Sequence, residues 1–379
     1  MQDVIRRMRP RRRADGLRGQ SRLASPAAAI LLLAAAACGP STAARGAAAP
    51  AAPAPSGAAP AAAPAAPAAG APAAPPAPLH VVANWTQPTG AMSGFWIAQE
   101  AGINREQGLD VELLNIANTS RVLQTMAAGE MDLSPLDPGT VIRASLGGLD
   151  GVLLYAQTNR LTFGVYAQPS IQDPQELRGK VLGTTRIGAS ANTALTVALK
   201  RWGLMPDRDV ALRQLGETQA IYAAMQAGQI DGAPFGLPVD RALLPNQREL
   251  INLATDGPEY ASIAAGGPRA WINDNEEAVR RFGRAYVLAI QRFKNDKAYT
   301  LDLYRKYLGK DGPEYLDAVY ALFSRTLPTL PYVTDEAMAS ALADLVEEEP
   351  QLAGHQGSEW VDSRFVREIE QSGLVAGSR

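Results

Sequence analysis

Residues 123–136, LQTMAAGEMDLSPL, and residues 222–235, YAAMQAGQIDGAPF, share one pattern. Both contain Met-x-Ala-Gly followed by Glu or Gln, then Met or Ile, then Asp. A proline comes three residues after the aspartate. Each stretch predicts an amphipathic helix that stops at a glycine, Gly129 or Gly228, because glycine adopts the left-handed conformation that ends helices. A strand is expected to start near Asp132 or Asp231, which we interpret as structural residues. The chain therefore contains two copies of one helix–strand unit.

The similarity continues on both sides of this unit. Upstream, AQEAGINREQGLDVELLNI (98–116) and ALKRWGLMPDRDVALRQLG (198–216) each predict a helix, a glycine stop, a turn and a strand led by Asp-Val. Downstream, VIRA (141–144) corresponds to VDRA (239–242). Three matches in the same order predict two α/β lobes in which strands and helices alternate, as they do in parallel sheets.

The order of the segments predicts two crossings between the lobes, near residues 165 and 265. Lobe one is expected at 79–167 and 267–379, and lobe two at 168–266. Two crossings form a hinge, and the carboxyl ends of both sheets then face a cleft. Open α/β sheets bind ligands at those strand ends, so we expect the ligand site between the lobes.

The N-terminal region has the features of an export signal. Residues 1–25 contain eight arginines and two aspartates, and an apolar stretch of 11 residues follows from Ala27 to Ala37. This stretch is too short to cross a bilayer, which takes about 20 helical residues, so residues 1–37 are predicted to be a signal peptide. Cys38, the only cysteine in the chain, would become the mature N-terminus. Ala-Ala-Ala-Cys resembles the lipobox of bacterial lipoproteins, which predicts lipidation of Cys38; cleavage by ordinary signal peptidase is the alternative.

The segment after Cys38 predicts a tether. From Ser41 to Pro78 nearly every residue is alanine, proline or glycine, and Arg45 is the only charged one. Such a composition cannot bury a core and favours an extended spacer. Residues 38–78 are therefore expected to hang the folded body from the outer face of the cell membrane.

Charge and motifs exclude several classes of function. Removing residues 1–37 leaves 28 basic and 36 acidic groups, a net charge of −8, which does not favour nucleic-acid binding. His80 and His355 lack metal-ligand spacing, so neither a metal nor a cofactor is expected. The sequence has no G-x-S-x-G, H-E-x-x-H or P-loop motif. We therefore predict that the protein is not an enzyme.

From about residue 79 to the end, the chain resembles the solute-binding proteins of ABC importers, in the group for alkanesulfonates, taurine, nitrate and thiamine precursors. The resemblance implies a two-lobed, class II periplasmic-binding-protein fold, here as a monomer. It also implies that the protein closes on a small anionic or heteroaromatic nutrient and docks on an ABC permease. The stretches that carry the resemblance are FWIAQEAGINREQGLDVELL, MAAGEMD, ELRGKVLGTT, ALKRWGL, MQAGQIDGAPF and WVDSRFVREI.

The resemblance also implies where the ligand is bound, in the loops that follow the strands. In lobe one the candidate residues are Trp85, Thr86, Gln87, Ser93, Phe95, Asn118, Ser120 and Asp137. In lobe two they are Gly188, Ala189, Ser190, Ala191, Glu217, Phe235 and Gly236.

The most specific candidate is the GASA stretch at 188–191. It lies at a predicted helix start, where free N–H groups and the positive end of the helix dipole form a cradle for an anion. Ser190 as a plain N-cap, without a ligand, is the alternative. Trp85 and Phe95 are either packing residues or stacking platforms. NWTQPT resembles the Trp-x-Pro stretch of thiamine-precursor binders, but the Asn and His that accompany it there are absent.

Two other functions stay open. Some thiamine-pyrimidine synthases share the implied fold and have a cysteine cluster near the site, whereas this chain has only Cys38. A ligand-presenting adaptor for a membrane sensor has no feature in the sequence that separates it from a transport component.

Overall fold

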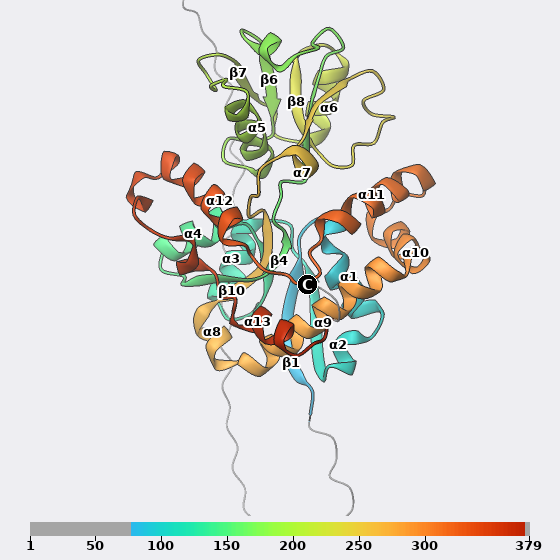
Figure 1. Cartoon of the computed structure of the whole chain (residues 1–379), viewed down its shortest axis with the longest axis vertical. Helices are drawn as coiled ribbons and strands as arrows, with labels where there is room; N and C mark the ends of the chain where they lie inside the picture. Colours follow the sequence, from blue (N-terminus) through green and yellow to red (C-terminus); the bar gives the residue numbers. More distant parts are fainter. Residues whose placement is uncertain (1–76, 376–379) are drawn as a thin grey trace, which may run out of the picture. The chain divides into compact units, whose positions relative to one another are not determined.

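The computed structural model describes residues 77–375 (Figure 1). The predicted signal peptide, Cys38 and nearly all of the predicted tether lie outside these residues. Among the described helices, none combines the length and the apolar character needed to cross a membrane.

The first part of the described chain alternates strands and helices. Its strands are β1 (Leu79–Trp85), β2 (Leu109–Asn115), β3 (Ser134–Leu136) and β4 (Gly151–Thr158). Its helices are η1 (Gly90–Met92), α1 (Ser93–Glu100), α2 (Ile103–Glu106), α3 (Thr119–Ala127) and α4 (Pro138–Leu146).

The middle part repeats this alternation. Its strands are β5 (Phe163–Ala167), β6 (Val181–Thr184), β7 (Ala211–Gln214), β8 (Gly232–Gly236) and β9 (Arg248–Asn252). Its helices are η2 (Pro174–Leu177), α5 (Ser190–Arg201), α6 (Thr218–Gln226) and α7 (Leu253–Asp256).

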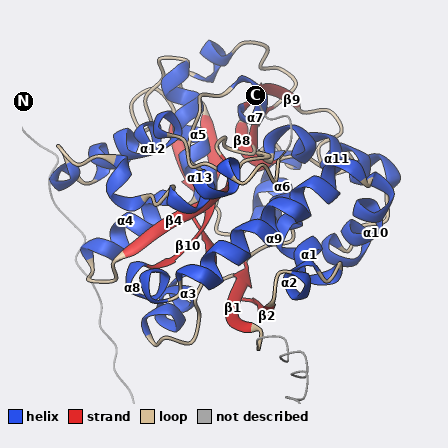
Figure 2. Cartoon of the chain, turned by 60° about the horizontal axis from the view of Figure 1, so that its bottom comes forward, coloured by secondary structure: helices blue, strands red, loops and turns tan. Residues whose placement is uncertain are grey.

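The last part is mainly helical. It contains strand β10 (Ile263–Pro268) and helices α8 (Arg269–Asp274), α9 (Glu276–Asn295), α10 (Lys297–Leu308), α11 (Pro313–Thr326), α12 (Asp335–Glu348), η3 (Pro350–Leu352), η4 (Gly357–Trp360) and α13 (Arg364–Gln371). Figure 2 shows how these helices surround the strands.

The strands form separate sheets for the two lobes. In lobe one, β1 and β2 are parallel, and β10 lies between β3 and β4 and is antiparallel to both. In lobe two the order is β7-β6-β8-β5-β9, with β6 parallel to β7 and β8, and β5 antiparallel to β8 and β9. The expected parallel units are present, but each lobe adds an antiparallel strand at a crossing.

These antiparallel strands correct the predicted lobe boundaries. Strand β5 pairs in the lobe-two sheet, and β10 pairs with β3 and β4 of lobe one, so residues 163–167 belong to lobe two and residues 263–266 to lobe one. The crossings are therefore residues 159–162 and 257–262, a few residues earlier than expected. We use lobe one for residues 77–158 and 263–375, and lobe two for residues 163–256. Local glycines and prolines mark a crossing, but hydrogen-bonded partners decide where a strand belongs.

The duplicated unit is confirmed in atomic detail. The Val82 N–H donates to Asp132 Oδ2 at 2.7 Å, and the Asp132 N–H donates to the Val82 carbonyl at 2.9 Å. In lobe two, the Val181 N–H donates to Asp231 Oδ2 at 2.8 Å, and the Asp231 N–H donates to the Val181 carbonyl, also at 2.8 Å. Each aspartate thus ties the strand after the glycine stop to the first parallel strand of its own lobe. The structural role predicted for both aspartates agrees with these bonds.

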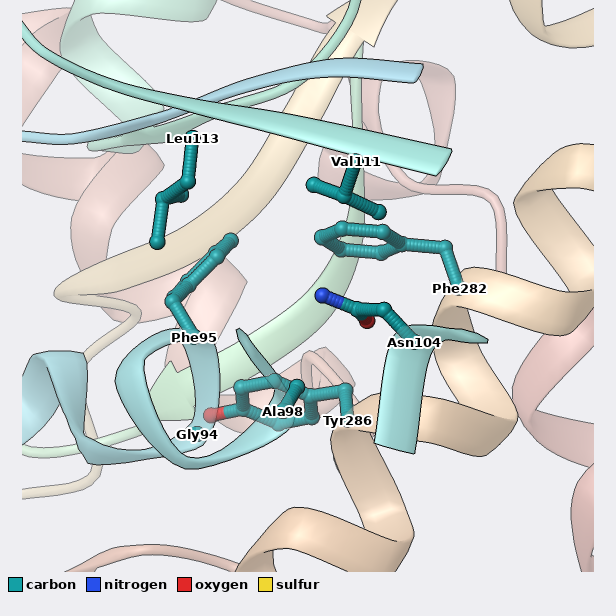
Figure 3. Close-up of a pocket in the computed structure, with 8 residues that line it drawn as sticks. All are labelled: Gly94, Phe95, Ala98, Asn104, Val111, Leu113, Phe282 and Tyr286. Carbon is teal, nitrogen blue, oxygen red and sulfur yellow. The ribbon is translucent and has the colours of Figure 1, made fainter. Parts of the chain in front are cut away.

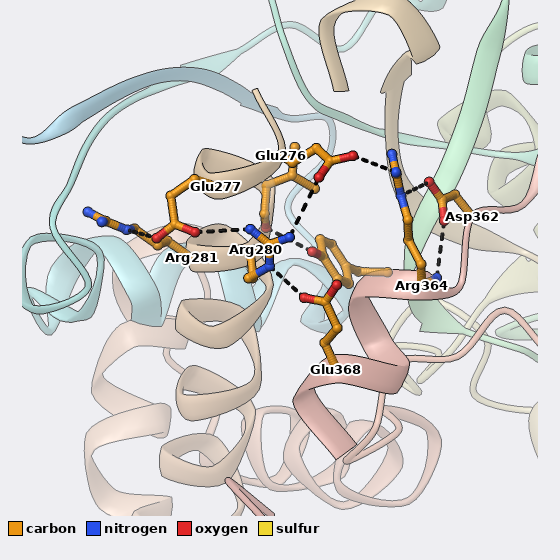
Figure 4. A network of polar contacts seen from close by, with 9 residues as sticks. Glu276, Glu277, Arg280, Arg281, Asp362, Arg364 and Glu368 are labelled. Atoms are coloured by element: carbon orange, nitrogen blue, oxygen red, sulfur yellow. Dashed lines mark hydrogen bonds and ion pairs between the residues drawn. The ribbon is translucent and has the colours of Figure 1, made fainter. Parts of the chain in front are cut away.

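The C-terminal helix is fixed to lobe one by ion pairs with α9 (Figure 4). Arg280 Nε lies 2.5 Å from Glu368 Oε2, and a second carboxylate, Glu277, lies 3.0 Å from Arg280 Nη1. Arg364 Nη1 lies 2.5 Å from Glu276 Oε1. Because α9 also packs against α1 and α2, these ion pairs join the C-terminal helix to the helices of lobe one.

Candidate functional site

The carboxyl ends of the parallel strands lead directly into helices in both lobes. In lobe one, β2 leads to α3 and β3 leads to α4; in lobe two, β6 leads to α5 and β7 leads to α6. Helix N-termini carry free N–H groups and a partial positive charge. Each lobe therefore presents helix starts at the edge where α/β sheets bind ligands.

Two helix starts of lobe one, those of α3 and α4, are capped by their own side chains, whereas η1 and α1, which follow β1, have no side-chain capping bond. Asn118 Oδ1 accepts a hydrogen bond from the Arg121 N–H at 3.0 Å, and Asp137 Oδ1 accepts one from the Thr140 N–H at 2.9 Å. Asn118 and Asp137, which we expected to contact ligand, thus act as N-caps of α3 and α4. Part of their hydrogen-bonding capacity is already used.

The helix starts of lobe two have no such closure. Ala189 occupies the N-cap position of α5 and Glu217 that of α6, and neither position has a side-chain capping bond. Ser190 is the first helical residue of α5 and is exposed, so the alternative in which Ser190 is the N-cap is wrong. The first-turn N–H groups of α5 remain available to another acceptor, as the cradle prediction requires.

Two buried polar side chains that the sequence analysis missed lie beside this helix start. Thr184 is fully buried, Asn192 is 6% exposed, and neither Thr184 Oγ1 nor Asn192 Oδ1 has a hydrogen-bond partner within residues 77–375. Thr184 points to the same face of β6 as Leu182, which packs in one core cluster with Leu195 of α5. Asn192 precedes Leu195 by three residues and shares its helix face.

Thr184 is the last residue of β6, and Asn192 lies in the first turn of α5. Buried polar atoms are nearly always hydrogen-bonded. Thr184 and Asn192 are two of ten residues within 77–375 that have a buried side-chain N or O atom without a partner, so what singles them out is their position next to the uncapped start of α5. The sequence did contain a signal: an asparagine on the apolar face of a helix, one turn before Leu195.

Three predicted contact residues belong to the core instead. Ser93 is fully buried, and its hydroxyl donates to the Gly90 carbonyl at 2.6 Å and lies 2.9 Å from the Tyr304 hydroxyl. Phe95 is 3% exposed and packs against Phe282 and Tyr286, and Phe235 is 1% exposed and packs against Tyr166 and Tyr222. The helical or strand face on which each residue lies turns it away from the loops. We therefore remove Ser93, Phe95 and Phe235 from the candidate site.

Phe95 also lines a cavity of about 10 Å³ in lobe one (Figure 3). Its walls come from α1, α2, β2 and α9, and they include the buried side chains of Asn104 and Tyr286. This volume holds one water molecule at most. The cavity lies inside the core rather than at the strand ends and is not the site of a nutrient-sized ligand.

The other predicted residues lie in the loops after the strands, at the strand ends or in the first turns of the helices that follow. Trp85 is half-buried, with its ring edge-on to Trp96 and Tyr307 at centroid distances of 5.4 and 5.8 Å. Its packing role is therefore clear, and part of its surface stays accessible. Exposed or half-buried positions also include Thr86, Gln87, Asn118, Ser120, Asp137, Gly188, Ala189, Ser190, Ala191, Glu217 and Gly236.

The loop before α5 carries an exposed charge and an exposed apolar side chain. Arg186 is exposed, and Ile187 is 52% exposed, although most isoleucines are buried. The Ile187 N–H donates to Gln214 Oε1 at 3.1 Å, which ties the loop to the end of β7. Within residues 77–375 no three His, Cys, Asp or Glu side chains gather as metal ligands.

A further group of hydroxyls lies in lobe two near α6. The pKa of Tyr222 is raised to about 12, mainly because the hydroxyl is buried and to a lesser extent because Tyr315 and Asp240 lie nearby. Tyr166 donates a hydrogen bond to Glu249, and burial and this carboxylate raise the pKa of Tyr166. Both hydroxyls are therefore neutral at physiological pH.

Two α/β lobes joined by two crossings, with helix starts at the strand ends, define the protein as one of the periplasmic-binding-protein fold. The family model described as NMT1/THI5 like matches residues 90–297, more than half of the chain. The chain belongs to this family. The family resemblance and the fold class predicted from the sequence are confirmed.

Solved structures agree with this fold. The periplasmic aliphatic sulphonate binding protein SsuA from Escherichia coli is 19% identical, with a TM-score of 0.61 over 74% of this chain and 96% of that chain. A putative periplasmic sulfonate-binding SsuA from Methylobacillus flagellatus KT is 17% identical, with a TM-score of 0.63 over 79% and 96%. The periplasmic nitrate-binding protein NrtA from Synechocystis PCC 6803 is 14% identical, with a TM-score of 0.51 over 79% and 98%. None of the curated proteins compared with the chain matches it.

Proposed function

We propose that the protein is the extracytoplasmic solute-binding component of an ABC importer. It captures a small molecule between its lobes and delivers it to a permease, without catalysis. The observation that carries this proposal is the uncapped start of α5, with the unsatisfied side chains of Thr184 and Asn192 beside it. Sulfonate- and nitrate-binding proteins of the same fold support the assignment.

The ligand that suits this position has an oxygen-bearing, anionic head group. The first-turn N–H groups of α5 donate to its oxygens, and the helix dipole contributes about 0.3–2 kcal/mol to binding an anion. The Thr184 hydroxyl adds a neutral donor, and the Asn192 amide adds a donor or an acceptor according to its rotation. Ile187, exposed on the same loop, offers apolar contact to the remainder of the ligand. A sulfonate or nitrate fits this set of groups.

Trapping follows from the hinge. Contacts to both lobes exist together only when the lobes close, so a ligand that touches both shifts the population toward the closed arrangement. In lobe one, the accessible candidates for the second set of contacts are Thr86, Gln87 and Ser120. The N-terminal region fits the same role: a signal peptide, lipidated Cys38 and a spacer would keep the binding protein beside its membrane partner.

The test begins with native mass spectrometry of the purified protein, to detect a co-purified small molecule. Calorimetry then measures the dissociation constants of that molecule, of nitrate and of methanesulfonate. Thr184→Val and Ser190→Asp should each weaken binding several-fold to tens-fold, because one removes a donor and the other places a negative charge at the cradle. Ser170→Asp, on an exposed loop of lobe two, is the matched control. Unchanged affinity for an anionic ligand in Thr184→Val and Ser190→Asp would refute the site.

A further inference from the structure

Lobe two is attached to lobe one by an ion pair outside the crossings. Lys200, in the last turn of α5, has its Nζ 2.6 Å from Asp344 Oδ1 and 2.8 Å from Glu347 Oε2, both on α12. The Lys200 side chain is 35% exposed and that of Asp344 is 23% exposed. One ammonium thus bridges two carboxylates of the other lobe in a partly sheltered position.

Helix α12 is well placed to hold lobe two because its base is fixed at a crossing. The Ala261 N–H donates to the Ala337 carbonyl at 2.8 Å, and the Thr334 hydroxyl donates to Glu259 at 2.7 Å. Ala261 and Glu259 both lie in the second crossing, residues 257–262. The first turn of α12 is therefore tied to the hinge, while its last turns reach α5.

A second, longer contact between the lobes involves the loop between α10 and α11 of lobe one. Lys310, between α10 and α11, has its Nζ 3.7 Å from Asp240 Oδ2 of lobe two. Figures 1 and 2 both show α12 beside α5, and α11 with α6 on the other side of α7. Lobe two thus has a close ion-pair contact with lobe one on one side and a longer one on the other.

We propose that Lys200, Asp344 and Glu347 form a latch that holds lobe two against α12 in the free protein. The latch rests on the proposed function only in assuming that the lobes move. Lys200 lies ten residues after Ser190, about 15 Å along the helix, so the latch acts at the far end of α5 from the ligand cradle. It therefore changes ligand affinity only through the position of the lobes, and this makes Lys200 a positioning residue.

The surroundings of the latch keep it charged. Burial alone disfavours the ammonium, but hydrogen bonds to Asp344 and Glu347 outweigh it and raise the pKa of Lys200. Burial, together with the nearby Asp344, also raises the pKa of Tyr260, which keeps that hydroxyl neutral. Glu348 pairs instead with Arg143 of α4. The Lys200 ammonium of the latch therefore stays positively charged at physiological pH.

The experiment measures the distance between the lobes without any ligand. Spin labels are placed at Ala211→Cys in lobe two and Ala339→Cys in α12, both exposed positions, in the full chain with Cys38→Ser. Pulsed electron resonance then gives the distance distribution. Lys200→Glu should lengthen and broaden it, with a fall of roughly two- to fivefold in the ratio of latched to unlatched molecules, the range for partly exposed ion pairs. If Lys200→Glu does not fold, Lys200→Gln takes its place.

Two further variants make the result specific. Arg201→Glu changes the charge of the neighbouring residue, which forms no ion pair within residues 77–375, and should leave the distribution unchanged. The reversed pair Lys200→Glu with Asp344→Lys should restore the short distance. An unchanged distribution in Lys200→Glu, or equal shifts in Lys200→Glu and Arg201→Glu, would overturn the latch. Because no ligand is present, either result leaves the binding test of the proposed function independent.

Discussion

Replacing Asp132 or Asp231 by alanine tests whether the repeated unit is held by the same bond in both lobes. In each lobe the carboxylate accepts a hydrogen bond from the N–H of the first parallel strand, at 2.7 Å from Val82 and 2.8 Å from Val181. Alanine leaves that N–H without its acceptor. Loss of such a partner costs about 1–3 kcal/mol of unfolding free energy. The cost lies toward the upper end of this range where water cannot take the place of the carboxylate.

The magnitude translates into a measurable change in melting temperature. For a domain of this size, 1 kcal/mol corresponds to about 2–4 °C, so each alanine variant should melt roughly 2–12 °C below the wild type. The two sites lie in different sheets and share no partner. Their free-energy changes should therefore add in the double variant within about 0.5 kcal/mol. Circular dichroism melts and urea titrations of the wild type, both single variants and the double variant provide the comparison.

Asparagine variants separate the hydrogen bond from the charge. Burial, opposed by the Val82 N–H, raises the pKa of Asp132, so the folded state binds its proton more tightly than the unfolded state does. As the pH falls from the raised pKa of Asp132 in the folded state to its lower pKa in the unfolded state, the unfolding free energy of the wild type should therefore rise relative to that of Asp132→Asn. At neutral pH, Asp132→Asn keeps an acceptor and should cost less than Asp132→Ala. Equal melting temperatures for the wild type and both alanine variants would refute the reasoning.

Two other predictions follow from the contacts of lobe one and from the N-terminal sequence. Arg280→Met removes ion pairs to Glu368 and Glu277 that are partly exposed, and it should lower unfolding free energy by about 1 kcal/mol in urea titrations. Arg105→Met, an exposed position without an ion pair in the described part of the chain, is its control, and an equal loss in both would contradict a specific role for the network. Cys38→Ala should give an exported product that is unprocessed or no longer sediments with membranes. Unaltered processing and fractionation of that variant would count against lipidation.

Features of the fold that depend on neighbouring residues were predictable from the sequence. The glycine stops have positive φ, 74° at Gly129 and 64° at Gly228, and each is followed by an aspartate at a strand start. These are short-range requirements of backbone conformation, and the duplication makes them visible twice. The two lobes and their crossings follow from the order of such units along the chain.

Where strands pair was beyond the sequence, because pairing joins residues far apart. Strand β5 follows a lobe-one strand along the chain, yet its backbone groups are satisfied by β8 and β9 of lobe two. Strand β10 finds its partners in β3 and β4 for the same reason. A segment joins the sheet that completes its hydrogen bonds, and that choice depends on the packing of the whole lobe.

In the candidate site, too, some features were predictable from neighbouring residues and others depended on distant contacts. The sequence alone determined that a helix begins near Ser190 after a strand, because small residues and glycine mark the turn. Only the tertiary structure decided that Ala189 caps it without a side-chain bond, that Ser93, Phe95 and Phe235 pack inward, and that Thr184 and Asn192 lack partners beside the helix start. The physical reason is that hydrogen-bond satisfaction and burial depend on every neighbouring element, including those distant in the sequence.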